Sequence, residues 1–125
     1  PDLCYKYALQ LSRGGVSRSS GVIRWTEYAL ENKQRWQGQT YKNRVFSLYK
    51  LRAEAGARLG EAAEKEFTTG DHTEENEAKA TRLRGSAKDY AKEWLDYARS
   101  SGQDTQTAMS LCVSAAGNRQ YCDGG

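Results

Sequence analysis

The chain has 125 residues, of which 38% are hydrophobic and 28% charged, a balance that excludes a disordered composition and fits a single domain (1–125). Its net charge of +3 is too small by itself to indicate nucleic-acid binding. The only proline is Pro1, so no position in the body of the chain lacks the backbone N–H that a helix interior needs. Because no run of Val and Ile alternates with a period of two, we predict an all-α fold, a bundle of about five helices.

Two short helices are predicted in the first third of the chain, at 3–13 and 21–37, because both segments repeat apolar residues at helical spacing. Gly14 and Gly15 end the first helix, since glycine tolerates the left-handed conformation found at helix C-termini. The apolar face of the first helix comprises Cys4, Tyr7, Ala8 and Leu11. The apolar stripe of the second comprises Val22, Trp25, Ala29 and Trp36, with Tyr28 beside it. We expect a bend or break near Gly38, because one helix continuing through the next segment would be too long for a small domain.

The centre of the chain predicts a long antiparallel helical hairpin with arms at 39–67 and 73–100. The turn lies around residues 68–72, and Asp71 or Thr73 is expected to cap the second arm. The second arm carries a heptad seam formed by Ala80, Leu83, Ala87, Tyr90, Trp94 and Tyr97. The first arm repeats Tyr41, Val45, Leu48, Ala55, Leu59 and Ala62, with Arg52 as the one interruption. The first arm also carries the small residues Ala53, Gly56, Ala57 and Gly60, which permit the close approach of a neighbouring helix.

A last short helix is predicted at 104–116, with residues 119–125 left as a tail. The three cysteines, Cys4, Cys112 and Cys122, allow three pairings. We favour Cys4–Cys112, with Cys4–Cys122 second, because a long closed loop constrains the unfolded chain most; Cys112–Cys122 would close only about ten residues. A disulfide predicts a periplasmic or secreted protein, and a cytoplasmic protein with three reduced thiols is the alternative.

The catalytic possibilities are few. His72 is the only histidine and lies in the polar turn, which excludes zinc sites built from several histidines and disfavours a nucleophile–histidine triad. The sequence contains no phosphate-binding, dinucleotide-binding or paired-cysteine redox motif. Its apolar runs are only a few residues long, so no membrane span is expected. We therefore expect no enzyme activity, no metal and no cofactor.

Acidic residues gather where the two arms of the hairpin meet. The tip comprises Glu61, Glu64, Glu66, Asp71, His72, Glu74, Glu75 and Glu77. The plain interpretation is a solvated turn whose first acids stabilise the helix dipole of the second arm. The functional interpretation is a docking surface for a basic partner protein.

A basic and aromatic stretch occupies residues 33–52. It comprises Lys33, Arg35, Lys42, Arg44, Phe46, Tyr49, Lys50 and Arg52. Such mixtures neutralise phosphates and stack bases in sites for single-stranded nucleic acid. Helical periodicity with aromatics inward and basic residues outward explains the same pattern, although Phe46 and Tyr49 lie off the apolar stripe.

The leading hypothesis for function is a small exported helical protein that acts by binding another protein, as an inhibitor, immunity factor, adaptor or effector-type module. One alternative is a nucleic-acid-binding protein that uses the stretch 33–52. A further alternative is a structural subunit of an oligomeric assembly in which the heptad seam pairs between chains.

Overall fold

The structure is a computed structural model that describes residues 2–32 and 38–123; for Asp2 and residues 38–42 it describes the backbone alone. Every regular element within these residues is helical, which confirms the predicted all-α fold. In chain order the elements are α1 (Asp2–Ser12), the 3₁₀ helix η1 (Gly15–Arg18), α2 (Ser19–Glu31), α3 (Gly38–Thr69), α4 (Glu74–Ser100), α5 (Gln106–Ala116) and α6 (Arg119–Asp123). None of the described helices is both long enough and apolar enough to cross a membrane.

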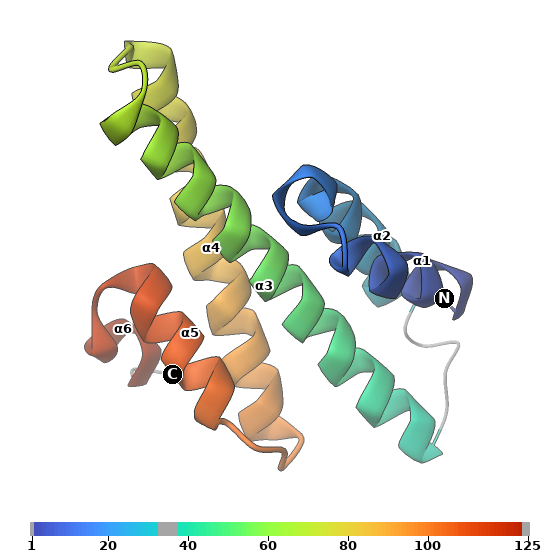
Figure 1. Ribbon diagram of the computed structural model, residues 1–125. Helices are drawn as coiled ribbons and strands as arrows, with labels where there is room; N and C mark the ends of the chain where they lie inside the picture. The colour runs from blue at the N-terminus through green and yellow to red at the C-terminus, as the bar shows by residue number, and fades with distance from the viewer. Residues whose placement is uncertain (1, 33–37, 124–125) are drawn as a thin grey trace.

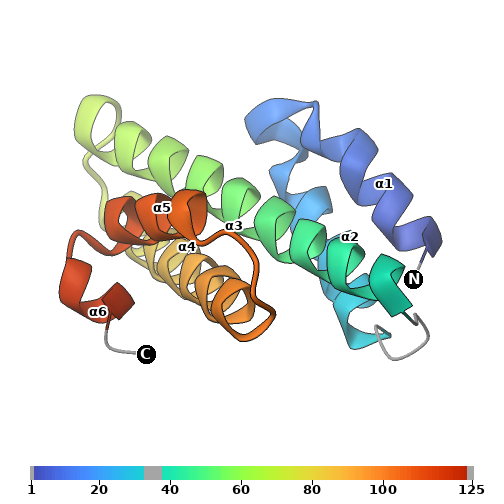
Figure 2. The same cartoon turned by 90° about the horizontal axis from the view of Figure 1, so that it is seen from below.

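The α3–α4 hairpin forms the centre of the molecule, with α1 and α2 on one side and α5 and α6 on the other (Figures 1 and 2). α1 and α2 pack on each other and on α3, whereas α5 packs mainly on α4 and carries α6. One buried cluster, on the C-terminal side, comprises Ala53, Ala91, Trp94, Leu95, Ala108, Cys112 and Cys122. A second, on the N-terminal side, comprises Ala8, Val22, Leu51 and Ala55.

The two hairpin arms approach each other closely at the glycines of α3, as their small size predicted. A Cβ atom on Gly60 would lie 3.5 Å from Cα of Arg84 and 3.6 Å from Cβ of Ala87. A Cβ atom on Gly56 would lie 2.9 Å from Cδ2 of Tyr90. The predicted α4 seam faces α3: Ala80, Ala87 and Trp94 are buried, and Leu83, Tyr90 and Tyr97 are half-buried. The seam is therefore occupied within the chain.

The break predicted near Gly38 is confirmed, because α2 ends at Glu31 and α3 begins at Gly38. Residues 33–37, the end of the helix predicted at 21–37, lie outside the described residues. The connection predicted before that helix is shorter than expected. Residues 15–18 form η1, and α2 begins directly afterwards, where the Ser19 hydroxyl donates to the carbonyl of Gly15 at 2.9 Å.

The C-terminal tail predicted at 119–125 is in part a helix, α6. Gly117 ends α5 in the left-handed conformation, with φ at 66°. The side-chain oxygen of Asn118 then accepts the backbone N–H of Gln120 at 2.8 Å, which supports the start of the new helix. The reversal brings Cys122 back against α5.

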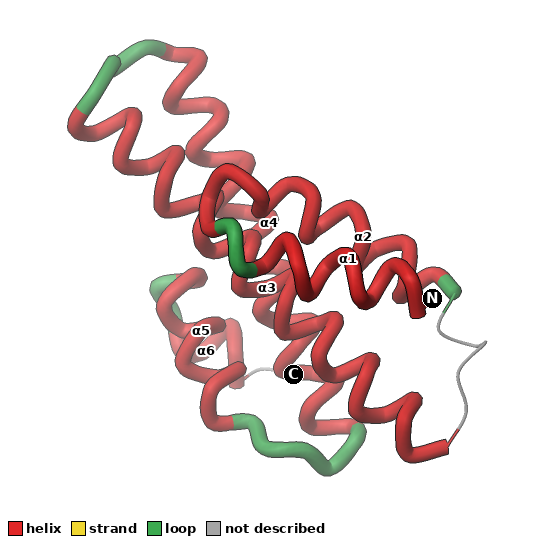
Figure 3. Tube along the Cα trace, turned by 45° about the vertical axis from the view of Figure 1, so that its right-hand side comes forward, coloured by secondary structure: helices red, strands yellow, loops and turns green. Residues whose placement is uncertain are grey.

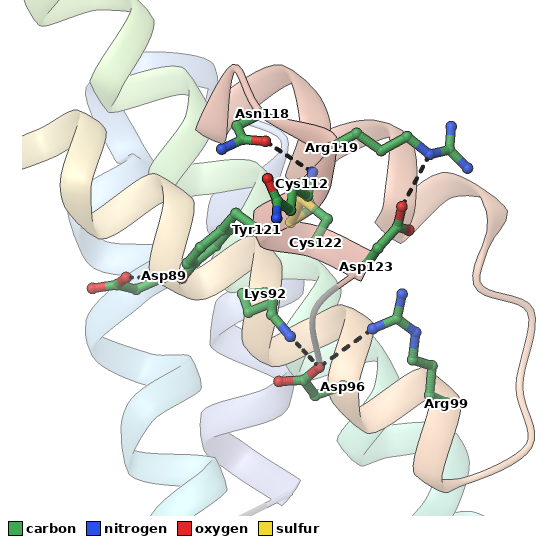
Figure 4. Close-up of a disulfide and its surroundings, with 11 residues drawn as sticks. Asp89, Lys92, Asp96, Arg99, Cys112, Asn118, Arg119, Tyr121, Cys122 and Asp123 are labelled. Atoms are coloured by element: carbon green, nitrogen blue, oxygen red, sulfur yellow. Dashed lines mark hydrogen bonds and ion pairs between the residues drawn. A yellow bond between two sulfur atoms is a disulfide. The ribbon is translucent and has the colours of Figure 1, made fainter.

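The disulfide joins Cys112 to Cys122, with their Cα atoms 6.1 Å apart (Figure 4). Both residues are fully buried, whereas Cys4 is a free, half-buried cysteine. The pairing favoured from the sequence, Cys4–Cys112, is wrong, and so is the second choice, Cys4–Cys122. The reason is spatial: α1 lies on the opposite side of the hairpin from α5 and α6 (Figures 1 and 2).

Tyr121 ties α6 to α4 beside the disulfide (Figure 4). Its hydroxyl donates to Oδ1 of Asp89 at 3.4 Å, and the Lys88 ammonium lies 4.9 Å from the centre of its ring. Burial, followed by the negative charge of Asp89, raises the pKa of Tyr121 above the usual tyrosine value. The neutral phenol is thus the form that the folded state favours.

Candidate functional site: the acidic end of the hairpin

Figure 3 shows the turn that joins α3 to α4 at the end of the hairpin. Short-range hydrogen bonds hold this turn. Of the two predicted caps, Thr73 is the one used: its hydroxyl oxygen accepts the backbone N–H of Asn76 at 3.1 Å. His72 Nε2 lies 2.8 Å from the carbonyl oxygen of Thr68, and its ring meets that of Phe67 edge-on, with centroids 5.8 Å apart. The turn is therefore a defined structure at the end of the hairpin.

The structure brings the predicted acidic residues together at the end of the hairpin that projects beyond the flanking helices (Figures 1 and 3). Glu64 is half-buried and its carboxylate lies 3.2 Å from Nε of Arg84. The other six carboxylates are exposed and form no ion pair with any residue in the described ranges. These six are Glu61, Glu66, Asp71, Glu74, Glu75 and Glu77.

A groove of about 320 Å³ borders this tip, between α3, α4 and α5. We call it the α3–α5 groove. Its apolar lining comprises Ala57, Gly60, Ala87, Leu111 and Ala115. Its polar lining comprises Glu61, Glu64, Lys65, Thr68, Arg84 and Ser114. The same small residues that let α3 and α4 approach closely leave this space unfilled. The groove therefore has an apolar floor, and its charged rim combines Glu61 and Glu64 of the acidic tip with Lys65 and Arg84.

The side chains of the tip and of the groove are suited to binding another molecule. Within residues 2–32 and 38–123, no three His, Cys, Asp or Glu side chains are arranged to hold a metal ion. His72 is exposed and engaged with the backbone of its own turn. What the site presents is unpaired negative charge beside an apolar recess.

The aromatic residues of the predicted basic stretch are used in packing between α3 and α4. The ring of Phe46 meets Trp94 edge-on, with centroids 5.8 Å apart. Tyr49 packs against Tyr97 at 5.1 Å. Both Phe46 and Tyr49 are half-buried. These two rings therefore serve the interior of the hairpin and do not form an exposed stacking surface.

The basic residues of the same stretch are dispersed. The Arg44 guanidinium lies 5.1 Å from the centre of the Tyr5 ring on α1, whereas Lys50 is exposed on the outside of α3. Arg52 is largely buried and pairs with Glu93 of α4. Outside the description lie Lys33, Arg35 and the side chain of Lys42. The basic side chains that the structure describes, Arg44, Lys50 and Arg52, do not lie together on one surface.

Arg52, the residue that interrupts the apolar stripe of α3, belongs to a polar cluster between α2, α3 and α4. Its guanidinium lies 4.6 Å from the centre of the Tyr90 ring and 5.5 Å from that of Tyr49. The hydroxyl of Tyr90 donates to Oε1 of Glu27 at 3.2 Å. Burial, followed by the charge and hydrogen bond of Glu27, raises the pKa of Tyr90, and the positive charge of Arg52 opposes this shift.

One surface was missed by sequence reasoning. The predicted α2 stripe is only partly interior: Val22 and Ala29 are fully buried, but Trp25 is half-buried and Tyr28 is 51% exposed. Tyr7 of α1, expected on an apolar face, is 42% exposed. The sequence did carry a signal for this surface, an excess of aromatic and basic residues in the first third of the chain. Because the spacing of the aromatic residues predicts an interior stripe, it gave no separate indication of an exposed surface.

Comparison with protein families, with curated proteins and with solved structures found no match to this chain.

Proposed function

We propose that this protein is a protein-binding module whose hairpin end takes a basic segment of a partner protein. The observation that supports the proposal is the coincidence of two features at one place. Six carboxylates that form no ion pair with any described residue lie at the free end of the hairpin, and a groove with an apolar floor opens beside them.

The charges of the tip favour a basic partner. Carboxylates that pair with no cation among the described residues stay available for lysine or arginine of another protein. Exposed charge pairs contribute only about 0.2–1 kcal/mol each, so their main effect is on orientation and association rate. Affinity must therefore come largely from elsewhere in the interface.

The α3–α5 groove is suited to supply that affinity. Its volume of about 320 Å³ is at the low end for a ligand pocket, which suits an apolar anchor side chain of a peptide better than a large cofactor. Leu111 and Ala115 of α5 form one wall, and Ala57 and Gly60 of α3 form the floor. Buried anchor residues that fill such recesses carry most of the energy of protein interfaces. The partner segment would accordingly combine basic residues with a leucine, methionine or aromatic anchor.

The compartment assigned to this function is periplasmic or secreted. The support is the disulfide between Cys112 and Cys122, which holds α6 against α5 at the far wall of the groove. Disulfides persist in oxidising compartments and are rare in the cytosol. An exported inhibitor, immunity factor, adaptor or effector-type module, acting without catalysis, fits these features.

Selection of short peptides from a random display library on the oxidised protein tests the proposal. We expect enriched peptides to carry clustered lysine or arginine around one large apolar residue. A variant with Glu61, Glu74 and Glu75 changed to Lys should bind these peptides at least about tenfold more weakly, a loss of about 1.4 kcal/mol. The difference in affinity between this variant and the unchanged protein should become smaller as ionic strength rises, because salt screens exposed charge pairs.

Glu31→Lys is the matched control, since Glu31 is an exposed acid on α2, away from the tip, and forms no ion pair with a described residue. This variant should bind the selected peptides as the unchanged protein does. Enrichment of acidic or uncharged peptides, or equal losses in the tip variant and in Glu31→Lys, would contradict the proposal.

A further inference from the structure

The exposed large hydrophobic side chains of the described residues all lie in the N-terminal part of the chain. They are Leu3, Tyr7, Val16 and Tyr28, with exposed fractions of 62, 42, 47 and 51%. Exposed apolar side chains that gather on one part of a surface mark an interaction site more often than scattered ones do. Val16 of η1 is the exception to this grouping, because it lines a small cavity together with Glu66 of the acidic tip. Leu3, Tyr7 and Tyr28 belong to α1 and α2, which lie away from the end of the hairpin that joins α3 to α4 (Figure 1).

Three of the aromatic rings on this face form a row. The ring of Tyr7 lies 5.1 Å from that of Trp25, and the ring of Trp25 lies 5.9 Å from that of Tyr28. Trp25 and Tyr28 stand three residues apart on one side of α2, while Tyr7 reaches them from α1. The row therefore crosses from one helix to the other and presents ring surface along its length.

A cavity of about 540 Å³ opens beside the first two rings of the row. Its lining comprises Tyr7, Gln10, Leu11, Arg13, Gly14, Arg18 and Trp25. No acidic residue is among them. Arg13 and Arg18 are exposed and form no ion pair with any residue that the structure describes. The cavity thus combines two unneutralised guanidinium groups with two aromatic rings.

Gly14 positions one of these arginines. A Cβ atom at residue 14 would lie 2.1 Å from Cγ of Arg18, so only glycine lets the stem of Arg18 cross the end of α1 here. Beyond the cavity, Arg24 stands four residues before Tyr28 on the same side of α2 and is exposed. Arg24 therefore places a positive charge beside the end of the aromatic row that lies beyond the cavity.

We infer that this face binds single-stranded nucleic acid. Guanidinium groups match phosphate oxygens in geometry as well as in charge. Aromatic side chains in a row accept successive unpaired bases, because every base has a flat π face. The cavity accommodates one nucleotide against Trp25, and the continuation of the row to Tyr28 and Arg24 accommodates the next, which favours a strand over a free nucleotide.

The inference differs in place from the nucleic-acid surface predicted at residues 33–52, where the described aromatic rings are packed between α3 and α4. It is also independent of the proposed protein-binding function. The Lys variants of Glu61, Glu74 and Glu75 leave every residue of the α1–α2 face unchanged. Failure of one proposal therefore leaves the other standing.

Fluorescence anisotropy with a labelled oligothymidylate at low ionic strength tests the inference. We expect the oligonucleotide to bind. The logarithm of the association constant should fall with the logarithm of salt concentration at a slope of about −2, because Arg13, Arg18 and Arg24 each release about 0.7 counterion from a single strand. Arg13→Ala and Arg18→Ala should each make the slope shallower by about 0.7. Tyr28→Ala should weaken binding by roughly fivefold or more through lost stacking, and because this ring is exposed the variant should fold normally.

The control is Arg119→Ala, which removes an exposed arginine from α6, on the opposite side of the hairpin from α1 and α2 (Figures 1 and 2). We expect its affinity and salt slope to match those of the unchanged protein within error. The inference is overturned by absence of binding at low salt, by equal losses in Arg119→Ala and Arg13→Ala, or by an unchanged affinity in Tyr28→Ala. Thymidine monophosphate binding as tightly as the strand, a duplex binding as tightly, or polyglutamate displacing the strand at equal charge would also overturn it.

Discussion

Three glycine-to-alanine substitutions in the hairpin separate the packing of α3 against α4 from intrinsic helix propensity. Alanine is favoured over glycine in a helix interior by about 1 kcal/mol. At Gly85 of α4 an added Cβ has nothing within 4 Å, so Gly85→Ala should raise the free energy of unfolding by about that amount. At Gly60 the nearest atom is the Leu83 carbonyl oxygen at 3.4 Å, an ordinary contact, so Gly60→Ala should also stabilise the fold.

Gly56→Ala should behave differently, because its Cβ would lie 2.9 Å from Cδ2 of Tyr90 and 3.4 Å from Cα of Ala87. The Tyr90 ring is held by the Glu27 hydrogen bond and by the Arg52 guanidinium, so it is not free to move aside. Overpacking of this kind costs about 1–3 kcal/mol. After the propensity gain, Gly56→Ala should be neutral to about 2 kcal/mol destabilising.

The assay is urea unfolding of the oxidised protein, followed by far-ultraviolet circular dichroism. The decisive quantity is the difference between Gly56→Ala and Gly85→Ala, predicted at about 1–3 kcal/mol, or roughly 4 °C in Tm for each kcal/mol. If Gly56→Ala stabilised the protein as much as Gly85→Ala, residue 56 would not face α4 and the described packing of the hairpin would be refuted.

Three further outcomes follow from buried groups. Trp94→Ala, which empties a site only 1% exposed, should lower the free energy of unfolding by about 3–5 kcal/mol in urea, and a loss below 1 kcal/mol would contradict the core described for this residue. Reduction of the Cys112–Cys122 bond should lower stability by about 2.7 kcal/mol in the chain-entropy model for a loop of this length, whereas an unchanged unfolding midpoint in reductant would show that the bond is absent from the folded protein. The pKa of Tyr90 is raised in the folded protein, so its stabilising contribution is complete below the unfolded value near 10 and is lost as pH rises through the folded pKa. Tyr90→Phe should therefore lose less stability above about pH 10 than the unchanged protein does. If the free energy of unfolding fell equally with pH in both proteins, the described surroundings of Tyr90 would be contradicted.

The hairpin was predictable because its signals are local. The heptad seam of α4 and the small residues Gly56 and Gly60 of α3 both follow from helical periodicity, and each lies where the pattern placed it. The meeting of the acidic residues at one end follows equally from two antiparallel arms of similar length. Only the interruption at Arg52 needed the partner helix for its explanation, since Glu93 and the Tyr90 ring come from α4.

The rest depended on contacts between distant segments. The disulfide pairing was wrong because loop length describes the unfolded chain and carries no information on which side of the hairpin Cys4 lies. The α3–α5 groove could not be anticipated, because α5 forms one wall and its docking position has no local signal. Likewise, the spacing of Trp25 marked it as interior, yet among the three stripe residues that the structure describes, Val22 and Ala29 are fully buried and Trp25 is half-buried.

The most direct test of the central proposal, a basic segment bound at the acidic end of the hairpin, is a titration followed by ¹⁵N–¹H correlation spectra. The titrant is a peptide enriched in the display selection. We predict that the amide signals that shift most belong to residues 71–77 of the acidic tip and to the segments that line the groove, which are 57–68 of α3, 84–87 of α4 and 111–115 of α5. Shifts confined to α1 and α2, or small shifts spread evenly over the protein, would contradict it.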